Sequence, residues 1–206
     1  MKNQNHLPLC AMALFMAVSI LGVSGKGTPP KNWWTADCPD YEVGVDAETK
    51  YKDKPSVFLK FIGTDKIAEK SADFTTLSQT IKAVKYRGKR VRFSAYIKSR
   101  DAASARLWMR VDGKSGDDAP AKDPILRFDN MEDRAIKGTA AWTKCEIVLD
   151  IPPESETIIF GFMLCGKGRM WGGGALFEIV DDKVPTTDML TWNVLSDQPL
   201  NLDFKE

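Results

Sequence analysis

The feature that most constrains this fold is the alternation of apolar and polar side chains with a period of two, which dominates the chain after residue 40. Each alternating run is rich in β-branched or aromatic residues and is bounded by Gly, Pro, Asp or Ser, as β-strands are. Short strands at this spacing favour a sandwich or barrel over helix-covered parallel sheets. We therefore predict an all-β fold. The predicted strands are Tyr41–Val45, Ser56–Ile62, Thr75–Lys85, Arg90–Lys98, Arg106–Val111, Ile125–Asp129, Lys144–Ile151, Thr157–Cys165 and Ala175–Val180.

The first 25 residues have the pattern of a secretory signal peptide. Lys2 is their one charged residue, and the uncharged run Leu7–Gly25 ends in the small residues Val23-Ser24-Gly25. The alternative is an uncleaved membrane anchor. That run is slightly shorter than the roughly 20 residues of a spanning helix, and it contains Pro8. We therefore expect a cleaved leader, a secreted or periplasmic protein, and no stable membrane span after cleavage.

Three parts make up the predicted domain organisation: a signal peptide over 1–25, a sandwich domain over 26–187 and an extended tail over 188–206. The tail has no clear alternation and contains Pro199, with Trp192 as its anchor. It can add an edge strand, lie over the sandwich or connect to a partner, and the sequence leaves these alternatives open.

Charge and histidine content exclude several classes of function. The chain has 29 Lys and Arg against 28 Asp and Glu, and cleavage of the leader removes Lys2 and no acid. A balanced charge gives no reason to expect a nucleic-acid partner. The single histidine, His6, lies in the leader, so the mature chain lacks the imidazole of a Ser-His-Asp triad or a His-ligated zinc site. We expect no catalysis, no cofactor and no metal.

Three cysteines remain after cleavage: Cys38, Cys145 and Cys165. An odd number permits at most one disulfide and leaves one thiol over. Cys145 shares a face with the apolar residues of its strand, so we interpret it as a small buried hydrophobe. The sequence leaves the pairing of the three open.

Alternation assigns the faces of two predicted strands. In Arg106–Val111, Trp108 and Arg110 lie on the face opposite the apolar residues, and Arg92 does so in Arg90–Lys98. If the two strands lie side by side in antiparallel order, they form an outward surface of indole and guanidinium groups, which Gln79 on the Leu77 strand would join. An aromatic ring stacks on the apolar face of a sugar while guanidinium and amide groups bind its hydroxyls. In the alternative interpretation, long cationic side chains simply cover an exposed sheet face.

The segment Arg127–Arg134 is the densest polar stretch of the chain. Asn130 and Arg134 are candidate ligand-binding residues there. Alternatively, the segment forms a structural cage in which Arg134 pairs with Asp129 or Asp133. A glycosidase using these two acids is disfavoured, because neighbouring arginines lower a carboxyl pKa whereas a general acid needs a raised one.

The glycine-rich segment Gly166–Gly174 resembles a phosphate-binding loop only superficially. It lacks the required order of Gly, Lys and Ser or Thr, and no helix follows it. We predict a flexible hairpin connection whose Trp171 packs on one end of the sandwich.

Several motifs resemble a bacterial domain family whose members are often labelled AraC-type transcriptional regulators although the domain lacks a DNA-reading helix. More distantly, the order of strands and turns is similar to galactose-binding-like, carbohydrate-binding jelly-roll modules. The resemblance implies a jelly-roll β-sandwich and does not identify a ligand. Such modules often carry Asp residues near a calcium, whereas the corresponding place here reads Gly172-Gly173-Gly174. The motifs are Leu77–Ile81, Tyr86–Arg92, Leu107–Val111, Phe128–Arg134, Gly138-Thr139, Trp142, Val148–Pro152, Gly161 and Gly166–Gly168.

The leading hypothesis is an exported, non-catalytic binding module for carbohydrate or another polar small ligand. One alternative is a structural or protein-interaction domain of the cell envelope, because Trp and Arg also dominate protein interfaces. A second alternative is a transcriptional regulator, which the family label suggests. The candidate ligand-binding residues are Trp108, Arg92, Arg110, Gln79, Asn130 and Arg134.

Overall fold

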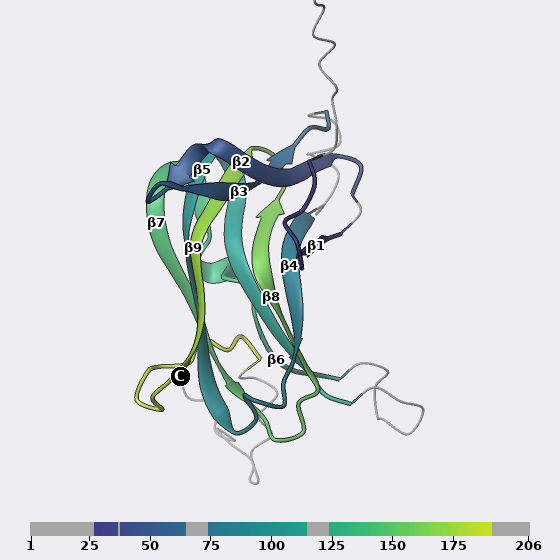
Figure 1. Cartoon of the computed structure of the whole chain (residues 1–206), viewed down its shortest axis with the longest axis vertical. Helices are drawn as coiled ribbons and strands as arrows, with labels where there is room; N and C mark the ends of the chain where they lie inside the picture. The colour runs from purple at the N-terminus through teal and green to yellow at the C-terminus, as the bar shows by residue number, and fades with distance from the viewer. Residues whose placement is uncertain (1–26, 37, 65–73, 115–123, 191–206) are drawn as a thin grey trace, which may run out of the picture.

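A computed structural model describes residues 27–36, 38–64, 74–114 and 124–190. These residues form nine β-strands and one short 3-10 helix, η1 (Glu132–Arg134), and the molecule is elongated along its strands (Figure 1). The predicted signal peptide and nearly all of the predicted tail lie outside the described residues. The strands are β1 (Trp34–Thr35), β2 (Tyr41–Tyr51), β3 (Lys54–Phe61), β4 (Phe74–Lys82), β5 (Lys89–Asp112), β6 (Ile125–Asp129), β7 (Ile136–Ile151), β8 (Thr157–Cys165) and β9 (Arg169–Val180).

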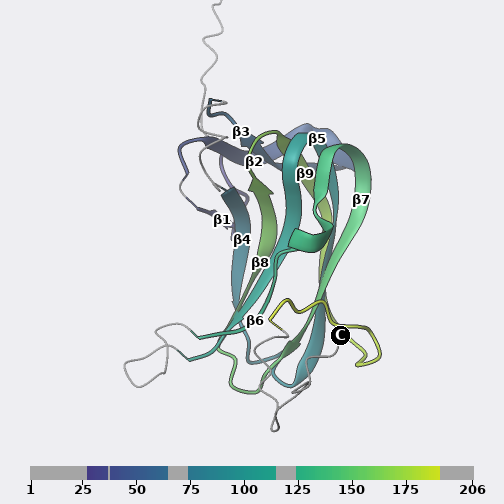
Figure 2. The ribbon, with the colours of Figure 1, turned by 180° about the vertical axis from the view of Figure 1, so that it is seen from behind.

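The nine strands form one curled sheet in the order β1-β4-β8-β5-β9-β3-β2, with β6 and β7 also paired to β5. Every pairing is antiparallel. The two ends of this order form the two layers of a jelly-roll sandwich, which confirms the predicted fold class. β7 follows one long edge of the molecule, and β1 with β4 lies at the other (Figures 1 and 2).

Strand β5 is the element that both layers share. Its first half pairs with β7 and β9, and its second half pairs with β8 and β6. The bend between the halves coincides with three register irregularities against β7 and with a left-handed backbone at Asp101 (φ 50°). β5 therefore leaves one layer and enters the other without a loop.

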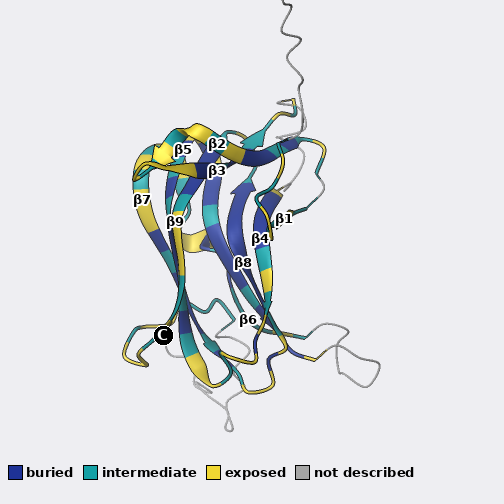
Figure 3. Ribbon diagram, in the orientation of Figure 1, coloured by how far each residue is buried: buried dark blue, intermediate teal, exposed yellow. Residues whose placement is uncertain are grey.

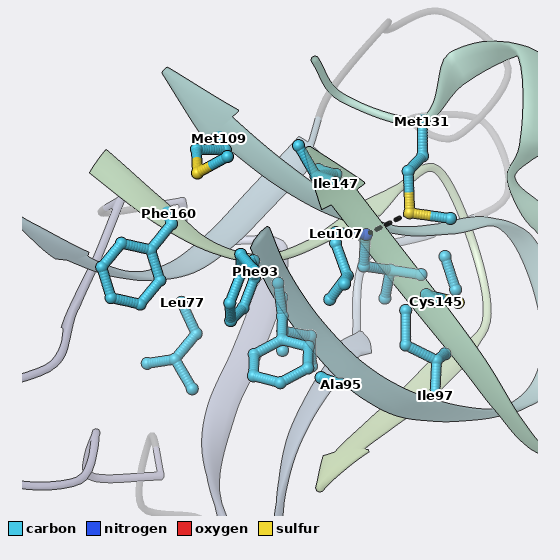
Figure 4. Packing of buried hydrophobic residues seen from close by; sticks show 14 of the residues in the cluster. Leu77, Phe93, Ala95, Ile97, Leu107, Met109, Met131, Cys145, Ile147 and Phe160 are labelled. Atoms are coloured by element: carbon cyan, nitrogen blue, oxygen red, sulfur yellow. Dashed lines mark hydrogen bonds between the residues drawn. The ribbon is translucent and has the colours of Figure 1, made fainter. Parts of the chain in front are cut away.

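The predicted side-by-side pairing of Arg90–Lys98 with Arg106–Val111 is wrong, because both segments belong to β5 and lie in different layers. Phe93, Ala95 and Ile97 from the first half and Leu107 and Met109 from the second half enter one core (Figure 4). Since these inward side chains meet between the layers, the outward side chains of the two halves point to opposite sides of the sandwich.

The predicted alternation of buried and outward residues is confirmed in both halves of β5. Val91, Phe93 and Ile97 are fully buried, and so are Leu107 and Met109. Burial of one such side chain contributes about 1.5–3 kcal/mol to folding. The buried positions form a continuous stripe along β8 and its neighbours (Figure 3).

The prediction of a hairpin connection over Gly166–Gly174 is wrong for its second half. Gly172, Gly173 and Gly174 belong to β9, and the connection ends before Arg169. A Cβ on Gly174 would be 2.6 Å from Tyr51 Cε1, and a Cβ on Gly172 would be 2.4 Å from Phe162 Cε1. The glycines are therefore needed for close packing rather than for a flexible loop.

The three cysteines Cys38, Cys145 and Cys165 are all free thiols in the described part of the chain. Burial raises the pKa of the Cys145 thiol to about 11. It packs in the main core, as expected for a small buried hydrophobe.

Candidate functional site

A groove of about 720 Å³ crosses the outer side of the layer formed by β4, β8 and the second half of β5. Its size lies within the range of small-ligand sites, roughly 300–1,000 Å³. We call this cavity the groove. Side chains of five strands line it, among them Trp34, Phe74, Thr76, Ser104, Arg106, Trp108, Arg110, Ile125, Phe128, Asn130 and Met163.

Trp108 lies in the floor of the groove and is 8% exposed, packed with Ile159 and Met163. Its Nε1 donates a 3.2 Å hydrogen bond to the hydroxyl of Ser78 on β4. Between them, Gly161 of β8 pairs with both residues, and a Cβ there would be 2.1 Å from the Leu77 carbonyl oxygen. The sequence placed Trp108 on the correct face, but the indole is part of a packed floor rather than an open platform.

Exposed aromatic surface comes instead from the rim of the groove. Trp34 on β1 is 42% exposed and Phe74 on β4 is 49% exposed, and both line the groove. Trp34 is held in place because its Nε1 donates a 3.1 Å hydrogen bond to Thr80 Oγ1. These two rings and the half-buried Phe128 give the groove aromatic walls.

Both arginines of the groove are paired with acids. Arg110 donates from Nε and Nη2 to Asp112 Oδ2, at 3.1 and 2.9 Å. Arg106 donates to Ser104 Oγ at 2.6 Å and lies 3.9 Å from Glu132. The groove therefore carries compensated charge, and its arginines have carboxylate partners without a ligand.

Two predicted site residues lie outside the groove. Arg92 is on the other layer, where it pairs with Glu178 at 2.7 Å. Gln79 is opposite Phe160 of the main core, so it points to the core side of β4 while Ser78 and Thr80 point to the groove side. Both residues lie away from Trp108 because of how distant strands pair, and the sequence pattern does not reveal that pairing.

The Arg127–Arg134 segment forms the structural cage that the sequence offered as its alternative. Arg134 donates to Asp129 Oδ2 at 2.5 Å and to Asp133 Oδ1 at 2.9 Å. Asp129 is fully buried and also accepts the N–H of Met131, whose sulfur accepts the N–H of Leu107 (Figure 4). Arg134 thus serves the loop, not the groove.

Asn130 does line the groove. Its Oδ1 accepts the N–H of Glu132 at 3.0 Å. Among the described residues its amide nitrogen has no other partner, so it can donate to a ligand.

Sequence reasoning missed Trp34 and Phe74. The Trp33-Trp34 pair was visible, but it precedes the first alternating run. The pairing of β1 with β4 places the two tryptophans on opposite faces. Trp34 lies opposite Ser78 on the groove side, while Trp33 packs against Phe160 and Phe162 in the core.

The described residues provide neither a membrane-spanning helix nor a cluster of metal ligands. No helix among them is long and apolar enough to span a membrane. They also contain no cluster of three or more His, Cys, Asp or Glu side chains placed to share a metal ion.

Comparison with curated proteins gives one decisive relationship. YbfP of Bacillus subtilis (strain 168), named an uncharacterized HTH-type transcriptional regulator, is 41% identical over 210 residues, covering 100% of this chain and 68% of YbfP. The chain belongs to the YbfP family. This relationship confirms the resemblance to a family labelled as regulators. No protein-family model matches the sequence.

Comparison with solved structures supports the fold of this YbfP relative. The xylan-binding CBM22-1 domain of Xyn10C from Paenibacillus barcinonensis superposes with a TM-score of 0.51 at 18% identity, covering 76% of this chain and 90% of that domain. The CBM22-1 and GH10 modules of Xyn10B from Clostridium thermocellum give a TM-score of 0.49 at 9% identity, covering 73% and 26%. The first likeness shows the jelly-roll fold of a carbohydrate-binding module.

Proposed function

We propose that this YbfP relative is a non-catalytic binding domain whose groove takes an uncharged carbohydrate. The observation that carries the proposal is the pair of exposed rings, Trp34 and Phe74, beside a groove of about 720 Å³. Aromatic rings stack on the C–H faces of pyranoses, and the groove is long enough to run over several strands. The fold shared with a xylan-binding domain is consistent with this ligand class.

The charge of the groove favours a neutral ligand. Arg106 and Arg110 already have carboxylate partners, so an anionic ligand would have to displace Glu132 or Asp112. Hydroxyls can instead bind the remaining polar groups, such as the amide of Asn130 and the hydroxyl of Thr76.

The absence of catalysis remains part of the proposal. The acids that a hydrolase would use, Asp129 and Asp133, both accept hydrogen bonds from Arg134. Asp129 is fully buried, and neither acid lines the groove, so neither is placed to act on a ligand there.

The proposal can be tested by calorimetric titration with xylohexaose and cellohexaose. We expect Trp34→Ala and Phe74→Ala each to weaken binding about tenfold, the loss of about 1.4 kcal/mol of stacking. The melting temperature should change little because both rings are rim residues.

Leu176→Ala is the matched control, because Leu176 is 51% exposed on β9 and does not line the groove. It should bind as the unmodified protein does. Absence of saturable binding to any neutral oligosaccharide in a glycan screen would contradict the proposal.

The regulator name of YbfP favours a second candidate function, in which the groove senses a sugar for transcriptional control. The cellular location of the protein distinguishes an exported binding domain from a transcriptional regulator. We propose export, which the leader-like pattern of residues 1–25 supports. Cell fractionation with mass spectrometry should find the chain without this segment outside the cytosol. Full-length chain retained in the cytosol would instead support the regulatory candidate.

A further inference from the structure

The outer side of the other layer carries a second tryptophan, Trp171 on β9, which is 2% exposed. Three cations lie around its indole ring: Lys98 Nζ at 5.6 Å, Arg100 Cζ at 5.4 Å and Arg169 Cζ at 4.5 Å from the centroid. Cation–π attraction acts at distances up to about 6 Å. We call Lys98, Arg100 and Arg169 the cationic cluster.

Arg100 differs from every other arginine of the chain. All nine arginines are in the described residues, and eight of them form an ion pair with a carboxylate. Arg100 has no such partner among the described residues, although it is exposed. Lys98 also forms no ion pair there, so two cations of the cluster are uncompensated.

The cluster carries a like-charge contact that folding alone does not favour. Arg100 lies directly opposite Arg169 in the β5–β9 ladder, where like charges destabilise the pairing. Arg169 lies between the rings of Phe58 and Trp171, and its Nε is buried without a hydrogen-bond partner among the described residues. Burial and the charge of Arg100 lower the pKa of Arg169.

In the part of the chain that the structure describes, Asp46 is the acid that contacts the cluster, and both of its oxygens already accept hydrogen bonds. Asp46 Oδ2 accepts from Arg169 at 3.0 Å and from the indole of Trp171 at 2.8 Å. Its Oδ1 accepts two backbone N–H groups, from Glu48 and Thr49. Nearby Glu42 pairs with Lys60. Neither acid compensates Arg100 or Lys98.

An aromatic cluster borders the cations on the same outer side. Tyr51 stacks on Tyr96 with centroids 4.4 Å apart, and Trp142 meets Tyr51 edge-on at 5.2 Å. Tyr96 and Lys98 occupy alternate positions of β5, so both point outward. All three rings are only partly buried. Ring surface and free positive charge therefore lie next to each other.

We propose that the cationic cluster, together with Tyr51, Tyr96 and Trp142, binds an acidic sugar through its carboxylate. Arg100 and Lys98 would pair with the carboxylate of a hexuronic acid, and the adjacent rings would contact its pyranose face. This site is distinct from the groove and faces the other side of the sandwich. It makes the domain one that contacts glycans of two charge classes.

Calorimetric titration with trigalacturonic acid tests the site. We expect saturable binding that Arg100→Ala weakens at least about tenfold, as loss of a charge-assisted pair does. Arg100→Lys should retain part of the affinity. Methyl-esterified trigalacturonic acid, which has the same rings without the charge, should bind about tenfold more weakly than the free acid.

Trp34→Ala is the matched control, because it removes a groove ring and leaves the cationic cluster intact. Its affinity for trigalacturonic acid should be unchanged, so failure of this site and failure of the groove are distinguishable. Binding that Arg100→Ala leaves unchanged would overturn the proposal. So would sodium sulfate competing as strongly as the sugar acid, since the site would then recognise charge without the ring.

Discussion

Each outer side of the sandwich contains a buried tryptophan, and the residues around the two indoles differ. Trp108 packs against the apolar side chains of Ile159 and Met163, and its N–H donates to the neutral hydroxyl of Ser78. Trp171 lies among three cations, and its N–H is satisfied by the carboxylate of Asp46. Among the described residues, the arginines of the first side have carboxylate partners, whereas Arg100 and Lys98 on the second side form no ion pair.

Strand β5 explains how one chain presents both surfaces. Its first half points Tyr96, Lys98 and Arg100 to one side, and its second half points Trp108 and Arg110 to the other. The outward residues of this one strand therefore lie on two different surfaces, because β5 passes from one layer to the other at its bend. A similar mix of Trp and Arg therefore has different consequences according to whether the arginines have acidic partners.

The largest expected effect comes from removing the better-buried indole. Trp171→Ala should lower the free energy of unfolding by about 4 kcal/mol, because it opens a cavity and leaves three cations without their ring. Urea unfolding at neutral pH measures the change. A loss below about 1 kcal/mol would show that the cations, not the indole, maintain this surface.

Trp108→Ala should cost less, about 3 kcal/mol, because its surroundings are apolar and can partly collapse. The outward indole predicted from the sequence would instead be open to solvent, and its removal would leave the melting temperature almost unchanged. A variant as stable as the unmodified protein, with binding abolished, would restore that interpretation.

Acid should weaken the cationic side through Asp46. Burial tends to raise the pKa of Asp46, but hydrogen bonds from Thr49, Trp171 and Glu48 outweigh it and lower the pKa from 3.8 to about 2. Since the folded state has the lower pKa, the stabilisation is complete above the unfolded pKa and is lost as the pH falls through the folded value.

Asp46→Asn isolates this contribution. At pH 7 the variant should unfold about 2 kcal/mol more easily, because charge-assisted hydrogen bonds are lost. The difference should shrink as the pH falls from 3.8 to about 2, where Asp46 itself becomes protonated. A difference independent of pH in denaturant titrations would contradict the assignment.

The smallest effect should come from Arg100→Ala. Removing this cation relieves its repulsion with Arg169 and also removes its contact with Trp171, so stability should change by less than about 0.5 kcal/mol. Arg110→Ala, which breaks a pair with Asp112, should instead destabilise by about 1 kcal/mol. Thermal unfolding of the two variants compares a free arginine with a compensated one.

Local features were predictable from the sequence, whereas long-range ones were not. The alternation of Val91 to Ile97 and of Leu107 to Val111 gave both inward faces correctly, because side-chain direction in a strand is local. The segment Ser99–Ala105 resembled a turn between strands, but it contains neither Gly nor Pro and continues as strand. That misinterpretation placed Arg92 beside Trp108.

In the candidate site too, the sequence predicted local features but not those that depend on strand pairing. Trp108, Arg110 and Asn130 do line the groove, while its exposed rings come from β1 and β4, whose positions depend on pairing with distant strands. Trp171 was expected at one end of the sandwich because three glycines follow it. Gly173 and Gly174 leave room for Tyr51, more than a hundred residues away in the sequence, and Gly172 leaves room for the ring of Phe162.

The indole N–H signals of the tryptophans report whether neutral sugars bind in the groove. During a nuclear magnetic resonance titration with xylohexaose or cellohexaose, whichever binds more tightly, the signals of Trp34 and Trp108 should shift. Those of Trp142 and Trp171 should stay in place, because they lie on the other side of the sandwich. Shifts confined to Trp142 and Trp171, or no shift at any tryptophan, would show that neutral sugars do not bind in the groove.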